Sequence, residues 1–211
     1  MCNDTYDQDR SILKVKLMMP RIREFDPDKA LDKALQLFWH KGYAETSMRD
    51  VVAATGVAHA GLYSAFGGKR QLYQAALERH LNVNMTHLLS SLTTPDAGRT
   101  ELEQFFEMML TIVRTGNFED GCFMANTAVA FGTEPSDILD IFNDHIERME
   151  SGFRSALENA KARGEVCANL NSVAVADLLV TVFNGMAVLA RGGAGYGRIK
   201  RSVRTALSIL D

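Results

Sequence analysis

The 211-residue sequence predicts an all-α protein in which a short N-terminal helix-turn-helix unit precedes a larger helical region. Three observations support this fold class. Apolar residues recur at intervals of three and four along most of the chain, which is the period of one face of an α-helix. Helix start and stop signals divide the chain into segments of ordinary helix length. No run of alternating apolar and polar residues ends in a hairpin turn, as paired strands would require.

The first helix signal lies at residues 26–28, where Asp26 can cap a helix and Pro27 takes the first helical position. Apolar residues then recur at helical spacing: Leu31, Ala34, Leu35 and Phe38. Gly42 follows, and glycine commonly ends a helix because it tolerates a left-handed backbone. We therefore expect the first helix to end at Gly42.

Residues 47–66 predict two short helices joined by a tight turn, and they read SMRDVVAATGVAHAGLYSAF. Ser47 can cap the first helix, and Asp50 stands three residues on, where an acid completes a capping box. Gly56 is expected to end this helix, and Val57 to fill the turn with an apolar side chain. A unit of this kind can lay its second helix in the major groove of DNA.

The apolar residues of these two helices predict a small shared core. From the first helix we expect three side chains to face inward: Val51, Val52 and Ala54. Leu62 and Phe66, four residues apart, give the second helix one apolar face. A Gly67-Gly68 break then precedes another amphipathic helix, so four short helices fit between residues 26 and 81.

The remainder of the chain predicts five further helices. Their approximate ranges are 102–113, 122–131, 136–163, 172–190 and 198–210. Glycines that can end a helix lie between some of these ranges, at Gly116, Gly121 and Gly164. We therefore divide the chain into an extension at residues 1–20, a helix-turn-helix domain at 21–81 and a helical domain at 82–211.

The extension at residues 1–20 is irregular and has no long apolar run of the kind a signal peptide carries. Two interpretations are open. The segment is either a flexible arm from which basic residues reach DNA, or it precedes the native start at Met18 or Met19. The basic residues of such an arm would be Lys14, Lys16, Arg21 and Arg23. We favour the second, and Arg21 and Arg23 remain candidate arm residues in both.

Charge separates the two domains. Residues 14–80 hold eleven Lys and Arg against seven Asp and Glu, whereas residues 81–211 hold eleven against sixteen. A basic N-terminal region on a chain of net charge −3 suits a protein that holds a polyanion with one end.

Motifs of catalytic and metal sites are missing from the sequence. It contains no nucleophile elbow, no HExxH, no phosphate loop and no dinucleotide fingerprint. The glycine-rich stretch 192–197 joins two helices and does not follow a strand. The three cysteines are far apart, and the five histidines show no metal-ligand spacing. We predict that the protein is not an enzyme and has no catalytic residue, no metal site and no cofactor.

Residues 25–77 strongly resemble the DNA-binding domain of the TetR family of bacterial regulators. The residues that carry the resemblance are Phe38, Gly42, Tyr43, Thr46, Ser47, Asp50, Val51, Gly56, Val57, Leu62, Tyr63, Phe66, Lys69, Leu72 and Tyr73. The resemblance covers about the first third of the chain and implies a homodimer that binds double-stranded DNA at a palindromic operator.

The resemblance also implies roles for particular residues. Tyr63 would contact a phosphate through its hydroxyl, and Lys69 would contact another. Thr46 and Arg49 would touch the DNA backbone or the groove edge, and His59 would lie close to base edges. The alternatives are that Tyr63 is a half-buried core aromatic and Lys69 an ordinary surface charge.

Three residues depart from the usual family pattern. Ala58 stands where a capping Ser or Asn is common, and Gly68 replaces a common Asp or Ser cap. Gly61 stands where a Ser or Thr often supplies a phosphate contact. We therefore expect much of the affinity to come from phosphate contacts and from close backbone approach at Gly61.

The segment 172–190 is apolar almost all round, which leaves two interpretations. It is at the short end for a membrane span and carries Asp177 and Asn184, so we prefer burial in protein and predict no membrane partner. The family resemblance implies that two C-terminal helices of each subunit form a four-helix dimer interface, and it places them near 136–163 and 172–190.

A pocket for a small-molecule inducer, partly apolar, is implied between the helix-turn-helix domain and that interface. Candidate residues are Phe105, Phe106, Met109, Cys122, Phe123, Met124, Asn126, Thr127, Phe131, Phe183 and Met186. Apolar residues at helical spacing are more often core, which is the competing interpretation for each of them. Cys122 opens a helix, where a thiol can have a lowered pKa, so oxidant or electrophile sensing is a further hypothesis.

These observations predict a dimeric, ligand-responsive transcriptional repressor that acts in the cytoplasm. The alternatives are a transcriptional activator of the same fold and an all-α interaction protein that does not bind DNA. Activation remains open because one docking geometry recruits or blocks polymerase according to the position of its site.

Overall fold

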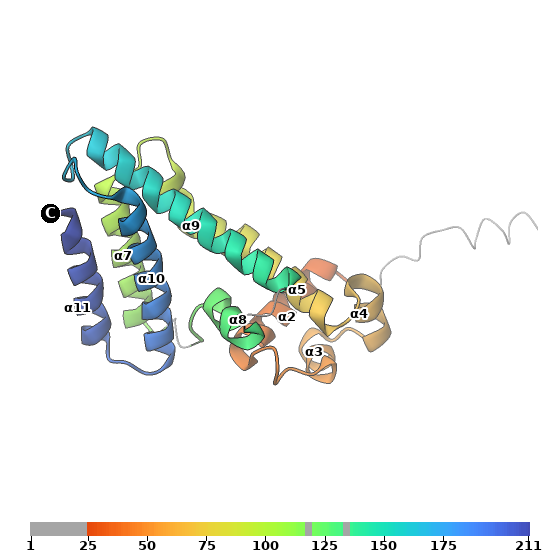
Figure 1. Cartoon of the computed structure of the whole chain (residues 1–211). Coiled ribbons are helices and arrows are strands. Elements are labelled where there is room, and N and C mark those ends of the chain that lie inside the picture. The colour runs from red at the N-terminus through yellow and green to blue at the C-terminus, as the bar shows by residue number, and fades with distance from the viewer. Residues whose placement is uncertain (1–24, 117–119, 133–135) are drawn as a thin grey trace, which may run out of the picture.

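A computed structural model describes residues 25–116, 120–132 and 136–211, and these residues form helices and connecting turns with no strand (Figure 1). The N-terminal helices are α2 (Pro27–Lys41), α3 (Met48–Thr55), α4 (His59–Phe66) and α5 (Lys69–His80). A π-helical segment (Leu81–Met85), α6 (Thr86–Leu89) and a 3-10 turn (Ser90–Thr93) extend α5. The C-terminal helices are α7 (Arg99–Arg114), α8 (Phe123–Phe131), α9 (Asp137–Ala162), α10 (Ser172–Arg191) and α11 (Tyr196–Leu207), with a final 3-10 turn (Ser208–Leu210). The all-α prediction is confirmed.

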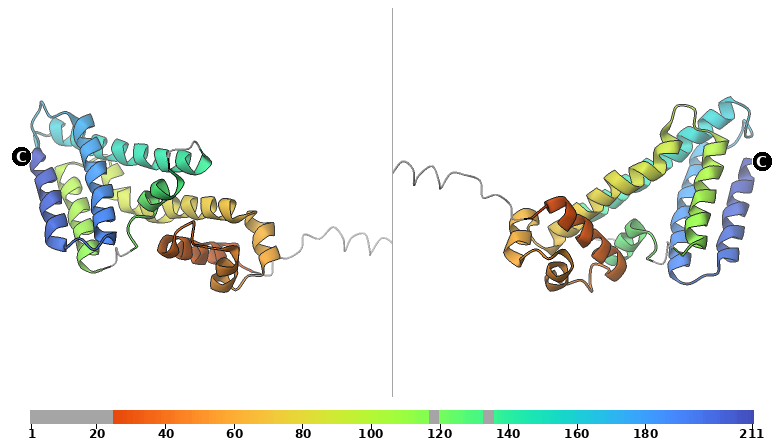
Figure 2. Two further views of the ribbon diagram at one scale, coloured as in Figure 1. Left: turned by 60° about the horizontal axis from the view of Figure 1, so that its bottom comes forward. Right: turned by 180° about the vertical axis from the view of Figure 1, so that it is seen from behind.

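The molecule is elongated. The N-terminal helices gather at one end, and α7, α10 and α11 lie side by side at the other, next to the C-terminus (Figure 1). Helix α9 reaches from the C-terminal helices to α5, and it packs against α10, α8 and α7 on the way (Figures 1 and 2). The predicted extension at residues 1–20, together with Arg21 and Arg23, lies outside the described residues.

The start of α2 follows from its capping residues. The Asp26 carboxylate accepts hydrogen bonds from the backbone amides of Asp28 at 3.0 Å and Lys29 at 3.3 Å. Gly42 ends the helix with φ of 85°, a conformation that suits glycine alone. Both boundaries agree with the sequence prediction.

The N-terminal core differs in detail from the predicted one. Phe38, Val51 and Leu62 are buried as expected, but Val52 is only half-buried and Ala54 is exposed. Thr55 is buried in the place predicted for Ala54, because it lies four residues after Val51 on the same helix face. Its hydroxyl donates to the carbonyl oxygen of Val51 at 2.8 Å, which satisfies a polar group in the core.

The C-terminal core is built from four aromatic rings of three helices. Phe105 and Phe106 of α7, Phe153 of α9 and Phe183 of α10 are almost fully buried. The Phe105 ring meets those of Phe106, Phe153 and Phe183 at centroid distances of 5.3, 5.3 and 5.7 Å, within the range of favourable aromatic pairs. These four rings hold α7, α9 and α10 together.

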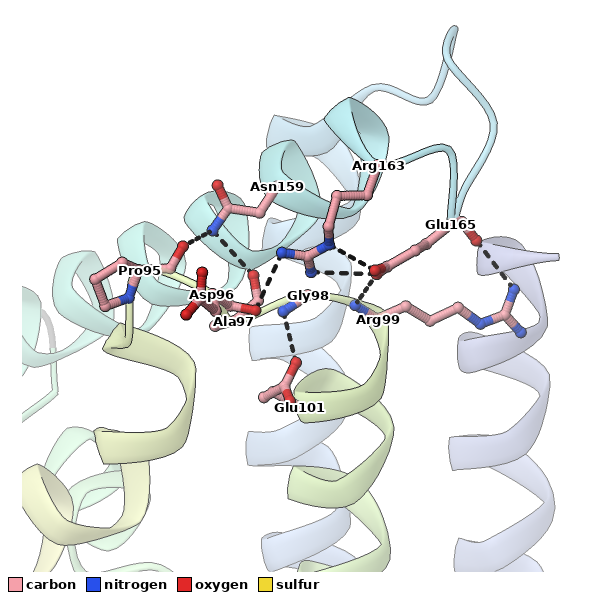
Figure 3. Close-up of polar contacts among 9 residues, drawn as sticks. All are labelled: Pro95, Asp96, Ala97, Gly98, Arg99, Glu101, Asn159, Arg163 and Glu165. Carbon is pink, nitrogen blue, oxygen red and sulfur yellow. Dashed lines mark hydrogen bonds and ion pairs between the residues drawn. The ribbon is translucent and has the colours of Figure 1, made fainter.

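A polar network joins the loop before α7 to the C-terminal end of α9 (Figure 3). The Arg163 guanidinium, just after α9, pairs with Glu165 at 2.6 Å and donates to the carbonyl oxygen of Asp96 at 3.1 Å. The Asn159 side chain donates to the carbonyl oxygens of Pro95 and Ala97 at 3.0 and 2.9 Å. The loop before α7 is therefore tied to the end of α9.

Helix α10 is the one helix of the described residues that is long and apolar enough, by length and composition, to cross a membrane. One of its faces, with Leu179 and Phe183, is buried against α9 and α11. The opposite face leaves four large apolar side chains exposed: Val173, Leu178, Val188 and Leu189.

The outward face of helix α9 is polar. Its apolar stripe, with Met149, Phe153 and Leu157, is buried against neighbouring helices of the same chain. Its exposed side chains from Asn143 to Glu158 are polar or charged. The expectation that α9 and α10 of each subunit form a four-helix dimer interface stays a prediction, and of these two helices α10 has the more apolar outward face.

Candidate nucleic-acid interface

Helix α3 begins at a complete capping box. The Ser47 hydroxyl accepts from the backbone amide of Asp50 at 3.2 Å, and the Asp50 carboxylate accepts from the amide of Ser47 at 2.7 Å. The same carboxylate pairs with the Lys41 ammonium at 2.8 Å. This ion pair, followed by the Ser47 hydrogen bonds, holds the pKa of Asp50 well below its usual value. The carboxylate thus stays ionised and joins the end of α2 to the start of α3.

The turn between α3 and α4 is built as the sequence predicts. Gly56 adopts a left-handed conformation with φ of 74°, and the buried Val57 follows it. No side chain caps the start of α4 at Ala58, also as predicted. The uncapped amides at the start of α4 leave a partial positive charge at that helix end, which favours an anion there.

The outer face of α4 carries the candidate DNA-reading side chains. Leu62 is fully buried and holds the helix to the core, whereas His59 and Tyr63, one turn apart, are exposed. Their rings lie 4.4 Å apart between centroids. The exposed fraction of Tyr63 is 45%, so it is not the half-buried core aromatic that was its alternative interpretation.

Gly61 does not face outward from α4. A Cβ atom added there would lie 3.2 Å from Val57 Cγ1 and 3.3 Å from Phe25 Cε1, both atoms of the protein itself. Glycine at this position lets the Phe25 ring pack on the helix. The expectation that Gly61 serves close approach to DNA is corrected accordingly.

Thr46 is buried and does not lie on the surface, where a contact with the DNA backbone or groove edge was expected. It is 1% exposed, and its hydroxyl donates to the carbonyl oxygen of Gly42 at 2.6 Å. The side chain supports the turn between α2 and α3 and does not reach solvent. Arg49, three residues on, is exposed on the first turn of α3, as expected of a backbone or groove contact.

Lys69 stands at the first position of α5. Its ammonium lies 4.2 Å from the centre of the Tyr43 ring and donates to the carbonyl oxygen of Ala44 at 3.4 Å. Partial burial lowers the pKa of Lys69 from its usual value. Gln71 caps the helix by accepting from the Gly68 amide at 3.0 Å, which replaces the missing cap side chain. The Lys69 ammonium is therefore held by contacts with Tyr43 and Ala44 and is not freely solvated.

Comparisons with known proteins agree on what this arrangement is. Residues 30–76 match the family model described as bacterial regulatory proteins, tetR family. Residues 98–205, about half of the chain, match the model described as tetracyclin repressor-like, C-terminal domain. The chain belongs to the TetR family. TetR-family proteins are transcriptional regulators and not enzymes, which confirms the prediction that this chain is not an enzyme.

Individual relatives extend the TetR-family match over nearly the whole chain. The HTH-type transcriptional repressor ComR of Escherichia coli is 29% identical over 196 residues, which are 92% of this chain and 93% of ComR. The TetR-family regulator CifR, solved with a 26-bp double-strand operator DNA, is 25% identical with a TM-score of 0.79 and covers 90% of this chain and 100% of its own. A regulatory protein TetR from Rhodobacter sphaeroides shares the fold at a TM-score of 0.77 and 20% identity, over 88% of this chain and 98% of its own.

The residues predicted for the ligand pocket of this TetR-family chain are mostly core residues. Those that are buried are Phe105, Phe106, Met109, Cys122, Phe123, Met124, Thr127, Phe183 and Met186. Asn126 and Phe131 are half-buried. Three surface clefts of about 330, 470 and 820 Å³ are lined by other residues of the described chain.

Two of these residues have clear structural roles. Thr127 shares a hydrogen bond of 2.8 Å with the Tyr73 hydroxyl, and burial raises the pKa of Tyr73 to about 12. The Asn126 side chain donates to the carbonyl oxygen of Asp120 at 2.8 Å. Both contacts hold α8 in place between the domains.

Cys122 does not have the environment of a reactive thiol. It is fully buried, and burial raises the pKa of its thiol above the usual value. The hypothesis of a lowered thiol pKa at the start of α8 is therefore wrong, because desolvation outweighs the favourable helix end. Among the described residues no group of three His, Cys, Asp or Glu side chains could hold a metal ion.

The sequence prediction missed the junction between the two domains. Trp39, His80 and Phe123 come together there from α2, α5 and α8, and His145 reaches the same region from α9. Their spacing in the sequence shows no pattern, since the four residues come from four separate helices. The one available signal was a histidine on the apolar stripe of each of two amphipathic helices.

Proposed function

We propose that this chain is a dimeric transcriptional repressor that binds a palindromic operator and is released by a small-molecule inducer. The observation that carries the proposal is the outer face of α4, where His59 and Tyr63 are exposed and no acidic residue interrupts the surface. Such a helix end, with a partial positive charge and an exposed phenol, suits a groove flanked by phosphates.

We expect this surface to make two kinds of contact with DNA, to phosphates and to base edges. We assign phosphate contacts to Tyr63, Lys69 and Arg49, because hydroxyl, ammonium and guanidinium groups supply register and affinity without reading sequence. We assign base contact to His59, whose ring lies beside Tyr63. The cation–π contact with Tyr43 keeps the Lys69 ammonium near the start of α5 and so reduces the entropy lost on binding.

The outward face of α10 supports dimerisation. Its exposed apolar side chains, Val173, Leu178, Val188 and Leu189, lie on the outward side of the helix, and a second copy of the chain would cover them by two-fold symmetry. Helix α11 packs against the buried face of α10 within the same chain (Figure 1). A two-fold dimer sets two copies of α4 about 34 Å apart, which is one turn of DNA.

Repression rather than activation is favoured by the relatives. ComR, which aligns with nearly the full chain, is named a transcriptional repressor. We retain residues 21–81 as the DNA-binding domain and 82–211 as the ligand-binding and dimerisation domain, and we expect the protein to act in the cytoplasm where its DNA lies. An inducer releases DNA only if it binds the released state of the dimer more tightly than the DNA-bound state.

The experiment is a gel shift of the full chain on the promoter region next to its own gene, with an excess of unrelated duplex as competitor. We expect a specific complex that contains two protomers and that blocks transcription from that promoter in vitro. A monomeric protein, or one that competitor DNA removes completely, would overturn the proposal. Stimulated transcription would overturn the assignment as a repressor.

A further inference from the structure

Two buried histidines lie where the DNA-binding domain joins the rest of the chain, and His145 is close enough to lower the pKa of His80. His80 is the last residue of α5 and is 3% exposed, and His145, in the N-terminal half of α9, is 1% exposed. The Nε2 atom of each ring is buried and has no hydrogen-bond partner within the described part of the chain. A buried polar atom without a partner costs free energy, so two at one junction require an explanation.

The proton of His80 can be placed from its neighbour. Asn84 Nδ2 lies 3.0 Å from His80 Nδ1, and an amide nitrogen donates. Because Nδ1 accepts this hydrogen bond, the single proton of the neutral ring lies on Nε2. His80 therefore presents an unsatisfied N–H donor at the junction.

Both rings are neutral at physiological pH. Burial lowers the pKa of His80 to about 4, and the nearby His145 adds to the effect. Burial, with a smaller contribution from Arg148, lowers the pKa of His145 to about 4 as well. In the protein without a bound ligand, the pair therefore offers hydrogen bonds without a charge.

The surroundings of His80 are aromatic. The Trp39 ring meets the imidazole edge-on at a centroid distance of 4.8 Å, and the Phe123 ring does so at 5.6 Å. Trp39 and Phe123 stack on each other at 5.8 Å. These rings favour an apolar molecule beside the His80 imidazole.

The backbone beside His80 is irregular. The π-helical segment Leu81–Met85 follows His80 directly and contains Asn84. Such segments are rare and occur often at functional sites, because they displace side chains from the regular helix register. Here the segment brings the Asn84 amide onto His80 Nδ1.

We infer that His80 and His145 are the polar anchors of a ligand site between α5 and α9, and that its ligand is a small, uncharged, mostly apolar carbonyl compound. The carbonyl oxygen accepts from His80 Nε2–H, and the carbon skeleton packs on Trp39 and Phe123. This inference rests on the proposed function, since the ligand would be the effector of the regulator. A ligand there acts on one end of α5, whose other end carries Lys69.

The experiment uses the full chain without DNA and follows the fluorescence of Trp39, the single tryptophan of the sequence. Cyclohexanone is the probe, with cyclohexanecarboxylate as the anionic comparison. We expect a saturable change of Trp39 emission with cyclohexanone and a weaker affinity, or none, for the carboxylate. In His80→Phe the affinity for cyclohexanone should fall by about fivefold or more, the loss expected for one buried hydrogen bond.

Two further variants make the result decisive. Asn84→Leu, at an exposed position, removes the contact that holds the proton on Nε2, and it should weaken cyclohexanone binding even if His80→Phe folds poorly. His87→Phe, an exposed histidine of α6, is the matched control and should bind as the wild type does.

The inference is overturned by any of three results. These are the absence of saturable cyclohexanone binding, an equal or higher affinity for the carboxylate, and unchanged affinity in both His80→Phe and Asn84→Leu. Operator binding is measured separately on the same proteins. Intact operator binding with no ketone binding rejects the ligand site alone, whereas a wild-type protein that binds no operator rejects the proposed function.

Discussion

The indole N–H of Trp39 donates a hydrogen bond to the carbonyl oxygen of Gly121 at 3.0 Å, and this contact joins α2 of the DNA-binding domain to the loop before α8. The neighbouring residue Asp120 strengthens the same junction. Its carboxylate accepts from His40 at 2.9 Å, and its carbonyl oxygen accepts from Arg191, at the end of α10, at 2.9 Å. One short loop thus touches the DNA-binding domain on one side and α10 on the other.

Removal of the Trp39 hydrogen bond should weaken the junction. Trp39→Phe keeps an aromatic ring but leaves the Gly121 carbonyl without its donor, so we expect the free energy of unfolding to fall by about 1 kcal/mol. Denaturant unfolding followed by circular dichroism measures this change. Tyr196→Phe, at the remote start of α11, is the control and should have little effect. Equal stability of Trp39→Phe and the wild type would show that the contact contributes nothing.

The two buried histidines should make the protein less stable in mild acid. The pKa of each is about 4 in the folded chain and about 6.5 in the unfolded chain, so between these pH values the unfolded state binds more protons. The free energy of unfolding should therefore rise with pH across this window, by up to about 1.4 kcal/mol per pH unit for each histidine. Unfolding of His145→Phe and of the wild type from pH 4.5 to 7 measures the slope.

In His145→Phe the free energy of unfolding should rise less steeply with pH than in the wild type, because one of the two buried histidines no longer contributes. His87→Phe removes an exposed histidine and should leave the slope as it is. A wild-type stability that does not change between pH 4.5 and 6.5 would contradict the neutral, buried state of both rings.

Gly98 should be intolerant of a side chain. A Cβ atom there would lie 1.7 Å from Arg163 Nη2 and 2.7 Å from Glu165 Oε2, so the guanidinium must leave the network of Figure 3. Its backbone φ of −151° is open to any residue, so the cost is steric and not conformational. We expect Gly98→Ala to lower the free energy of unfolding by about 1 kcal/mol.

A double-mutant cycle tests the cause of that loss. In an Arg163→Ala background the obstacle is gone, so Gly98→Ala should then cost little. The same loss in both backgrounds would mean that Arg163 is not the reason for glycine at this position.

The outward face of α10 should control the oligomeric state. Val188→Asp places a charge on a side chain that is 55% exposed in one protomer, which a twin subunit would have to desolvate. We expect a shift from dimer to monomer in sedimentation velocity and at least a tenfold loss of operator affinity. Val129→Asp, on α8 with 83% exposure, carries the same change away from this face and should remain dimeric. A dimeric Val188→Asp variant would place the dimer contact elsewhere.

The sequence predicted the helix boundaries well because its signals are local. Capping residues such as Asp26 and Ser47, and the left-handed Gly56, act through atoms within a few residues of themselves. A stripe of apolar residues likewise reports the inward face of one helix without reference to its neighbours.

The errors concern residues whose surroundings come from distant parts of the chain. Thr46 is buried by the turn it supports, and Gly61 faces the Phe25 ring. Cys122 stands at a helix start, as predicted, but the helices packed around it desolvate the thiol and raise its pKa. The outward face of α10 could not be told from its inward face, because both are apolar in sequence.

The most direct measurement of DNA binding is the salt dependence of operator affinity for the wild type, Tyr63→Phe and Lys69→Gln. The controls are Tyr196→Phe and Lys200→Gln, a Tyr–Lys pair of α11 that also makes a cation–π contact. If Tyr63 and Lys69 contact phosphates, Lys69→Gln should reduce the slope of log affinity against log salt by about one unit. Tyr63→Phe should weaken binding to operator and unrelated DNA alike, and both controls should match the wild type. Wild-type affinity and slope in both test variants would contradict the assignment of α4 and the start of α5 as the DNA-binding surface.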